Sequence, residues 1–173
     1  TLGKHDGRPS GPCPTVNGFL MKKVIVIGSG GAGKSTFSRR LGDALGIEVI
    51  HLDQLYWQPN WVEPAKEDWA ATVGKLLTGD AWIIDRNYSG TRTIRLNACD
   101  TVILLDLPRT TCIFRVLKRR LKYRGQNRPE MAVGCPEKID LKFLLWVWNF
   151  PKKKKPGILA EFEHFPNKDI VVL

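Results

Sequence analysis

The strongest constraint on the fold is one stretch in which an apolar run passes through a glycine-rich loop into an amphipathic segment. Residues 23–28 read KVIVIG, residues 28–36 read GSGGAGKST and residues 34–45 read KSTFSRRLGDAL. An unbroken β-branched run is typical of a strand buried on both faces. The last segment places four apolar side chains on one side of a helix: Phe37, Leu41, Ala44 and Leu45. The stretch therefore predicts a strand, a tight loop and a helix that ends at Gly46.

The same alternation continues along the chain. Further strands are predicted at 48–53, 81–85, 101–107 and 169–173, and further helices at 65–79, 108–124, 140–150 (ended by Pro151) and 157–165. Residues 125–138 contain prolines and glycines and little periodicity, so they are predicted to form a long mobile loop. Strands alternating with helices indicate an α/β fold with a parallel sheet covered on both faces.

The glycine-rich loop matches the pattern G-x-x-x-x-G-K-[ST] and lies between a predicted strand and a predicted helix, as that motif requires. Its backbone N–H groups and the helix N-terminus suit a nucleotide phosphate. Lys34 is expected to reach the β- and γ-phosphates, and the Ser35 hydroxyl to bind Mg²⁺. The predicted nucleotide-binding set is Gly28, Gly30, Gly31, Ala32, Gly33, Lys34, Ser35 and Thr36.

Three predicted strands end in carboxylates, Asp53, Asp85 and Asp106. In parallel sheets ligands bind outside the carboxyl ends of the strands, so the three carboxylates form one candidate constellation, although each alone could cap a helix or turn. Phosphoryl transfer with magnesium needs one carboxylate near the metal and another near the attacking hydroxyl. Asp85 is predicted for the first role and Asp53 for the second.

Positive charge is concentrated in the middle of the chain, since residues 109–155 carry 14 Lys and Arg against 3 Asp and Glu. Such a field suits a phosphate-rich ligand, a nucleic acid or an anionic membrane. The helix predicted at 108–124 has an apolar face of Ile113, Val116, Leu117 and Leu121, and a basic face of Arg115, Lys118, Arg119 and Lys122. The basic face is either a solvated surface or a set of groups that closes over a polyphosphate.

The length of 173 residues suits one domain, which we expect to begin at residue 21 after a flexible extension at residues 1–20. Four cysteines without metal or secretory spacing favour a reduced, cytoplasmic protein. No apolar run approaches the roughly 20 residues that span a bilayer, so no membrane partner is expected. A monomer or a dimer is expected.

The stretches VIVIGSGGAGKSTFSRRL, HLDQLYWQPNW, WIIDRNYSGT, LLDLPR and FRVLKRRLKYRG resemble the small P-loop kinases related to adenylate kinase, and among them the topology modulation proteins. The resemblance covers residues 21–173 and implies a three-layer P-loop NTPase sandwich with strand order 2-3-1-4-5. It implies that Arg115 and Arg119 flank the nucleotide and that residues 125–138 form the lid. It also implies that Asp85 acts through magnesium-bound water, so the predicted catalytic set is Lys34, Asp53, Asp85 and Arg119, with Ser35 and Asp85 as the metal site.

Several neighbouring residues are open to two interpretations. Arg86 stands where the resembling proteins usually carry glycine, and its side chain is expected to point into the site or to shift the backbone. Arg92 and Arg95 either bind an acceptor phosphate or lie on a solvated helix. The aromatic group Tyr56, Trp57 and Trp61 forms either an acceptor pocket or a packed cluster. His51 is expected to be structural, and Lys152–Lys155 to be solvated or to contact an anion or a nucleic acid.

Two functions follow from these patterns. The first is a kinase that moves the γ-phosphate of ATP to an unidentified small acceptor, with Mg²⁺ as cofactor and a lid that excludes water. The alternative is a nucleic-acid-associated ATPase that modulates DNA topology, whose binding would be nonspecific and salt-dependent. A GTPase is disfavoured, because NKDI at residues 167–170 places its aspartate one residue too early for N-K-x-D.

Overall fold

The computed structural model describes residues 15–16, 19–126, 129–136 and 140–173. Most of the extension predicted at residues 1–20 therefore lies outside the described residues. The elements in chain order are β1 (Thr15–Val16), β2 (Phe19–Leu20), β3 (Lys23–Gly28), α1 (Lys34–Leu45), β4 (Val49–His51), α2 (Leu52–Tyr56), η1 (Pro59–Trp61), α3 (Lys66–Leu76), β5 (Trp82–Asp85), η2 (Ser89–Thr91), α4 (Arg92–Ala98), β6 (Thr101–Leu105), α5 (Arg109–Lys122), α6 (Leu141–Lys153), α7 (Lys155–Phe162) and β7 (Asp169–Val172).

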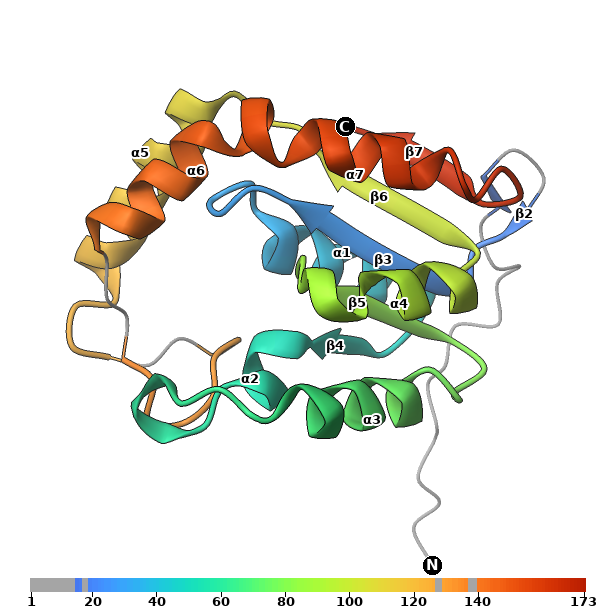
Figure 1. Ribbon diagram of the computed structural model, residues 1–173, viewed down its shortest axis with the longest axis horizontal. Helices are drawn as coiled ribbons and strands as arrows, with labels where there is room; N and C mark the ends of the chain where they lie inside the picture. The colour runs from blue at the N-terminus through green and yellow to red at the C-terminus, as the bar shows by residue number, and fades with distance from the viewer. Residues whose placement is uncertain (1–14, 17–18, 127–128, 137–139) are drawn as a thin grey trace, which may run out of the picture.

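The main sheet has five parallel strands in the order β4-β5-β3-β6-β7 (Figure 1). Counted along the chain, this is the order 2-3-1-4-5, so the predicted fold class and strand order are confirmed. His51 pairs with Asp85, and Gly28 pairs with Leu105. The strands consequently finish at a common edge, and the loops that follow them meet there.

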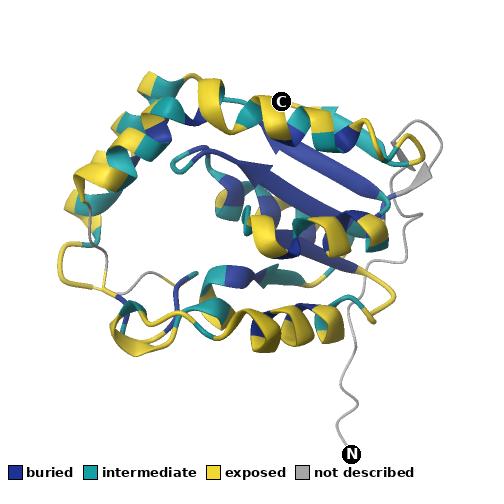
Figure 2. Cartoon of the chain, viewed as in Figure 1, coloured by how far each residue is buried: buried dark blue, intermediate teal, exposed yellow. Residues whose placement is uncertain are grey.

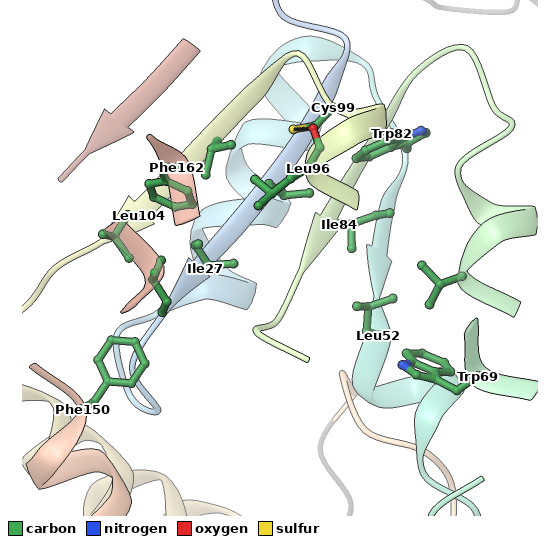
Figure 3. Close-up of a cluster of buried hydrophobic side chains, with 14 residues drawn as sticks. Ile27, Leu52, Trp69, Trp82, Ile84, Leu96, Cys99, Leu104, Phe150 and Phe162 are labelled. Atoms are coloured by element: carbon green, nitrogen blue, oxygen red, sulfur yellow. Dashed lines mark hydrogen bonds between the residues drawn. The ribbon is translucent and has the colours of Figure 1, made fainter. Parts of the chain in front are cut away.

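The central strand β3 is buried on both faces, as its apolar run predicts. Ile25 and Ile27 belong to a cluster that α3, α4 and α7 cover, part of which Figure 3 shows. Val24 and Val26 belong to a second cluster with side chains of α1, α5 and α6. All four side chains are 0% exposed, and Figure 2 shows the strand as buried beyond its first residue. Each such burial contributes about 1.5–3 kcal/mol, so β3 holds the two helical layers together.

Three of the four side chains on the predicted apolar face of α1, Phe37, Leu41 and Leu45, pack against the core, but the face is not complete as predicted. Ala44 is exposed, whereas Ser38 and Gly42 are buried. A Cβ at Gly42 would lie 2.5 Å from Cγ2 of Val49, closer than side chains approach one another. The apolar periodicity missed Ser38 and Gly42 because neither residue is strongly apolar. Their small size lets α1 lie directly against β4.

Two element boundaries also differ from the sequence prediction. β4 ends at His51, and Asp53 lies in the first turn of α2. Helix α6 does not end at Pro151 but continues to Lys153. A proline removes one backbone donor from a helix, yet the next turn still closes, with Lys154 N donating to Phe150 O at 2.9 Å. The lysine run therefore lies at the junction of two helices.

Helix α5 buries only part of the apolar face predicted for it, since Ile113 packs against the core and two of the leucines do not. Val116 is buried, but Leu117 and Leu121 are exposed to 45% and 76%. The reason is the position of α5, which lies beside α6 at the carboxyl end of the sheet (Figure 1) and meets the rest of the chain along a narrow stripe. In the part of the chain that the structure describes, no helix combines the length and the hydropathy needed to cross a membrane.

Candidate functional site

The glycine-rich loop connects β3 to α1 and is pressed against α5 and α6. A Cβ at Gly31 would lie 2.3 Å from the carbonyl oxygen of Cys112, and one at Gly30 would lie 2.8 Å from Phe143. Gly31 also has φ +81° and Gly33 has φ +92°, conformations that favour glycine. These glycines let two helices approach the loop closely.

Lys34 is the first residue of α1, and its side chain folds back into the loop. Its Nζ donates to the carbonyl oxygens of Gly28 at 2.9 Å and Ser29 at 2.8 Å. Burial, aided by the positive charge of Arg86, lowers the pKa of Lys34 to about 7. The ammonium is thus held by weak neutral acceptors, and an anionic phosphate in the loop would stabilise its charge much better.

Asn87 fixes the start of the loop, a role that the sequence analysis missed. Its Nδ2 donates to the carbonyl oxygen of Gly28 at 2.8 Å, and its Oδ1 accepts from the N–H of Gly28 at 3.0 Å. The sequence offers one signal for this role: Asn87 comes two residues after Asp85, the last residue of the strand that pairs with β3. Its meaning depends on the pairing of β3 with β5.

Asp85 is completely buried at the end of β5. Its Oδ1 lies 3.0 Å from Nδ1 of His51, and its Oδ2 accepts from Nη1 of Arg86 at 2.8 Å. Burial alone would raise the pKa of Asp85, but the charge of Arg86 and the hydrogen bond with His51 hold it below its ordinary value. His51 therefore helps to orient the buried carboxylate of Asp85, in line with the structural role expected for His51.

Arg86 joins Asp53, Asp85 and the loop into one cluster. Its Nε donates to Oδ2 of Asp53, and its Nη1 also donates to Oγ of Ser35 at 2.8 Å. Oδ1 of Asp53 accepts from the hydroxyl of Tyr88 at 2.7 Å. Burial opposes the charge of Arg86, but Asp53 and Asp85 raise its pKa above the ordinary value. Of the two alternatives expected for Arg86, the side chain points into the site.

The cluster forms the floor of a cavity of about 1090 Å³. Its other walls come from the phosphate loop, from α5 and α6, and from residues that follow α2 and α5. Of the predicted site residues, those that line it are Gly30, Gly31, Gly33, Lys34, Ser35, Thr36, Asp53, Arg115 and Arg119. The cavity therefore brings together, from three separate segments of the chain, most of the residues predicted to bind nucleotide and acceptor.

Part of the cavity lining, away from the glycine-rich loop in the sequence, is aromatic. Trp57 and Trp61 line it, with ring centroids 5.2 Å apart. Met131, Ala132 and Cys135, from the loop predicted as a lid, are buried and pack against these two rings. The described part of that loop thus lies over the tryptophans.

Three predicted site residues do not line the cavity. Gly28 is the last residue of the central strand β3 and lies against β6, where a Cβ would be 2.6 Å from the carbonyl oxygen of Leu105. Ala32 is 3% exposed and belongs to the core. Asp85 is completely buried and pairs with Arg86, and of these two residues only Arg86 lines the cavity.

The other candidates are held elsewhere. Asp106 pairs with Lys155, and Arg92 pairs with Glu161. Arg95 is 0% exposed and donates to backbone carbonyl oxygens, so neither arginine of α4 lies where it could bind an acceptor phosphate. Both interpretations offered for these arginines, an acceptor site and a solvated helix face, are wrong for Arg95.

The oxygen atoms of the predicted magnesium site do not fit the ion as the side chains lie. The hydroxyl of Ser35 accepts from Arg86, and all four carboxylate oxygens of Asp53 and Asp85 already contact neighbouring side chains. Within the described ranges, no group of three or more His, Cys, Asp and Glu side chains is arranged to hold a metal. The guanidinium of Arg86 contacts both residues of the predicted metal site, Ser35 and Asp85.

Comparison with known proteins agrees with this architecture. No protein-family model matches the chain, and no curated protein sequence matches it. Among solved structures, shikimate kinase from Acinetobacter baumannii in complex with shikimate is similar over 88% of this chain and 83% of its own, with TM-score 0.56 and 16% identity. Shikimate kinase from Bacteroides thetaiotaomicron is similar over 81% and 82%, with TM-score 0.52 and 15% identity.

These likenesses show that the chain has the fold of a small P-loop kinase. The resemblance inferred from the sequence is thereby supported at the level of the fold. The narrower resemblance to topology modulation proteins stays a prediction.

Proposed function

We propose that this chain binds ATP in the cavity and transfers its γ-phosphoryl group to a small acceptor that lies between Asp53 and the two tryptophans. The observation that carries the proposal is the cavity itself, in which a phosphate loop faces a carboxylate and an aromatic wall. Ligand pockets usually have volumes of roughly 300–1,000 Å³, so a cavity of about 1090 Å³ has room for a nucleotide and a second molecule.

The nucleotide half would use the loop and α5. The loop N–H groups and Lys34 would meet the β- and γ-phosphates. Arg115 and Arg119 line the same cavity, and Nη1 of Arg115 lies 3.4 Å from the carbonyl oxygen of Ala32, at the loop. Their guanidinium groups would stabilise the charge that develops on the transferring phosphoryl group.

In the transfer step the acceptor oxygen would attack the γ-phosphorus. A bond forms between these two atoms, the bond from the γ-phosphorus to the β–γ bridging oxygen breaks, and ADP leaves with that bond pair. The proton of the acceptor hydroxyl would pass to Asp53, whose carboxylate faces the cavity. Residues 125–138 would act as the lid that excludes water, since the described part packs on Trp57 and Trp61.

The test is ADP release from ATP in the presence of a panel of nucleotides, nucleosides and small alcohols. One acceptor class should raise ADP release many-fold, with a phosphorylated acceptor as the second product, and Asp53→Asn should abolish that rise while ATP still binds. Asp106→Asn is the matched control, because Asp106 follows another strand of the same sheet, β6, but pairs with Lys155 and does not line the cavity. A flat panel would overturn the kinase proposal.

The alternative from the sequence, a nucleic-acid-associated ATPase, has weaker support. Four of the 14 Lys and Arg in residues 109–155 line the cavity, where they could meet the nucleotide: Arg115, Arg119, Lys122 and Lys142. Lys118 and the lysines at 152–154 are exposed and could meet a duplex. Salt-dependent binding to duplex DNA, with ATP hydrolysis that rises with the DNA, would favour the alternative over the kinase.

A further inference from the structure

Arg86 holds the position beside the phosphate loop where a divalent cation would have to lie. Its guanidinium contacts the hydroxyl of Ser35 at 2.8 Å, one carboxylate oxygen of Asp85 at 2.8 Å and one of Asp53. A magnesium ion at such a loop requires the hydroxyl as a direct ligand and carboxylates nearby. The same three oxygen-bearing groups are here gathered by a cation that belongs to the chain.

The backbone around Arg86 is built to place this side chain. Arg86 has φ +110°, a conformation in which residues other than glycine are strained. Buried Arg95 holds the strained turn by donating to the carbonyl oxygens of Arg86 at 2.9 Å and of Asn87 and Tyr88. Strain that surrounding structure maintains in this way is concentrated at functional positions.

Charge argues against a second cation at the same place. Arg86 already pairs with the carboxylates of Asp53 and Asp85, and the buried ammonium of Lys34 lies in the adjacent loop, on the carbonyl oxygens of Gly28 and Ser29. A divalent ion would meet the guanidinium at short range and would find its oxygen ligands occupied. A triphosphate, in contrast, would find a wall rich in cations, since Lys34, Arg39, Arg115, Arg119, Lys122 and Lys142 also line the cavity.

The guanidinium still has donors for a ligand. Its Nε and Nη1 make the contacts to Asp53, Asp85 and Ser35, whereas Nη2 makes no hydrogen bond to any residue that the structure describes. Arg86 lines the cavity with 13% of its side chain exposed. An arginine fixed on one side by carboxylates and open on the other is well suited to a phosphate oxygen.

We propose that Arg86 takes the place of magnesium, so that this chain binds a nucleoside triphosphate as the metal-free anion. Nη2 of Arg86 and Nζ of Lys34 would meet the β- and γ-phosphates from two sides of the loop. The inference rests on the proposed function, since it requires the nucleotide to occupy the phosphate loop. It deepens that function by naming the ligand form as free ATP, whereas a loop without this arginine would take the magnesium complex.

The test measures ATP affinity calorimetrically at constant ionic strength, once with excess EDTA and once with millimolar MgCl₂. The unsubstituted chain should bind ATP at least as tightly in EDTA as with magnesium. Arg86→Gly should bind about 10-fold or more weakly in EDTA, the loss expected for one charged hydrogen bond, and magnesium should restore its affinity. Glycine is chosen because it tolerates φ +110° and leaves room for the ion.

The matched control is Arg39→Gln, which removes one positive charge from the same cavity at a side chain that pairs with Glu130 and does not reach Ser35. It should weaken ATP binding equally with and without magnesium. A second readout needs no nucleotide: MgCl₂ alone should raise the melting temperature of Arg86→Gly but not of the unsubstituted chain.

The outcomes separate the two proposals. If the unsubstituted chain binds ATP only with magnesium, Arg86 does not replace the ion, and the kinase proposal stands. If it binds ATP under neither condition, the proposed function fails and the inference fails with it. If Arg86→Gly does not fold, the affinity of the unsubstituted chain for ATP in EDTA still decides whether magnesium is needed. Arg86→Lys then provides the comparison, because it keeps the positive charge but loses the planar guanidinium.

Discussion

Arg95 offers the sharpest test of how the fold supports the site. Its side chain is 0% exposed, and it donates to the carbonyl oxygens of Thr91, Arg86, Asn87 and Tyr88. These acceptors lie in the turn between β5 and α4 that carries the cluster beside the phosphate loop. We predict that Arg95→Met, which keeps the apolar stem and removes the guanidinium, destabilises the whole fold and loosens this turn.

The size of the effect follows from two opposing contributions. Four hydrogen bonds from a charged donor stabilise the fold by about 1.5 kcal/mol each, or about 6 kcal/mol together. Burial of the guanidinium cancels part of this gain, as the pKa of Arg95, lowered from 12.5 to about 10, indicates. The expected loss in unfolding free energy is therefore about 3 kcal/mol rather than the full sum, equivalent to a melting temperature about 10 °C lower for a chain of this size.

The assay is urea unfolding followed by circular dichroism, with ATP affinity measured on the folded protein. Arg92→Met is the control, because Arg92 lies on the same helix and pairs with Glu161 near the surface; its loss should cost less than about 1 kcal/mol. The reasoning is refuted if Arg95→Met unfolds like the unsubstituted chain and instead weakens only acceptor binding.

Two further predictions concern packing and pH. Gly42→Ala should destabilise the fold by about 1–3 kcal/mol, since its Cβ would lie 2.5 Å from Val49, whereas Gly74→Ala, with nothing within 4 Å, should stabilise α3 by about 0.5–1 kcal/mol; equal urea midpoints for the two variants would contradict this. Burial lowers the pKa of Lys34 from 10.5 to about 7. Between pH 7 and pH 10.5, Lys34 is therefore protonated in the unfolded chain and mostly deprotonated in the folded chain. The unfolding free energy should therefore rise with pH between about 7 and 9 by up to about 1.4 kcal/mol per unit relative to Lys34→Met, and a pH-independent difference between the two proteins would show that Lys34 keeps its proton.

Local patterns were sufficient for most of the fold. The apolar run of β3, the glycine loop and the amphipathic α1 were found with their correct bounds, because burial on both faces and helical spacing leave a direct mark on neighbouring residues. The errors lie where the partner is distant in sequence. Leu117 and Leu121 are exposed because α5 packs mainly on α6, and Asp53 lies in the first turn of α2 because β4 ends two residues earlier, at His51.

The candidate site divides in the same way. The motif from Gly28 to Thr36 was readable because a phosphate loop needs its residues in one continuous order. Asn87 and Tyr88 belong to no such continuous motif, since they contact Gly28 and Asp53 from the turn that follows β5. Arg95 was misread for a related reason: a charged residue on a short helix looks solvated until the turn that accepts its hydrogen bonds is known.

The sequence by itself determined an α/β chain with a phosphate-binding loop, because periodicity and a contiguous motif are local properties. Only the tertiary structure decided what lies against that loop. It places Arg86 between Ser35, Asp85 and Asp53, three residues separated by up to 51 positions from the arginine that joins them. Which cation meets a phosphate depends on distances of a few ångströms between such residues, and these distances exist only after the strands of the sheet have been brought side by side.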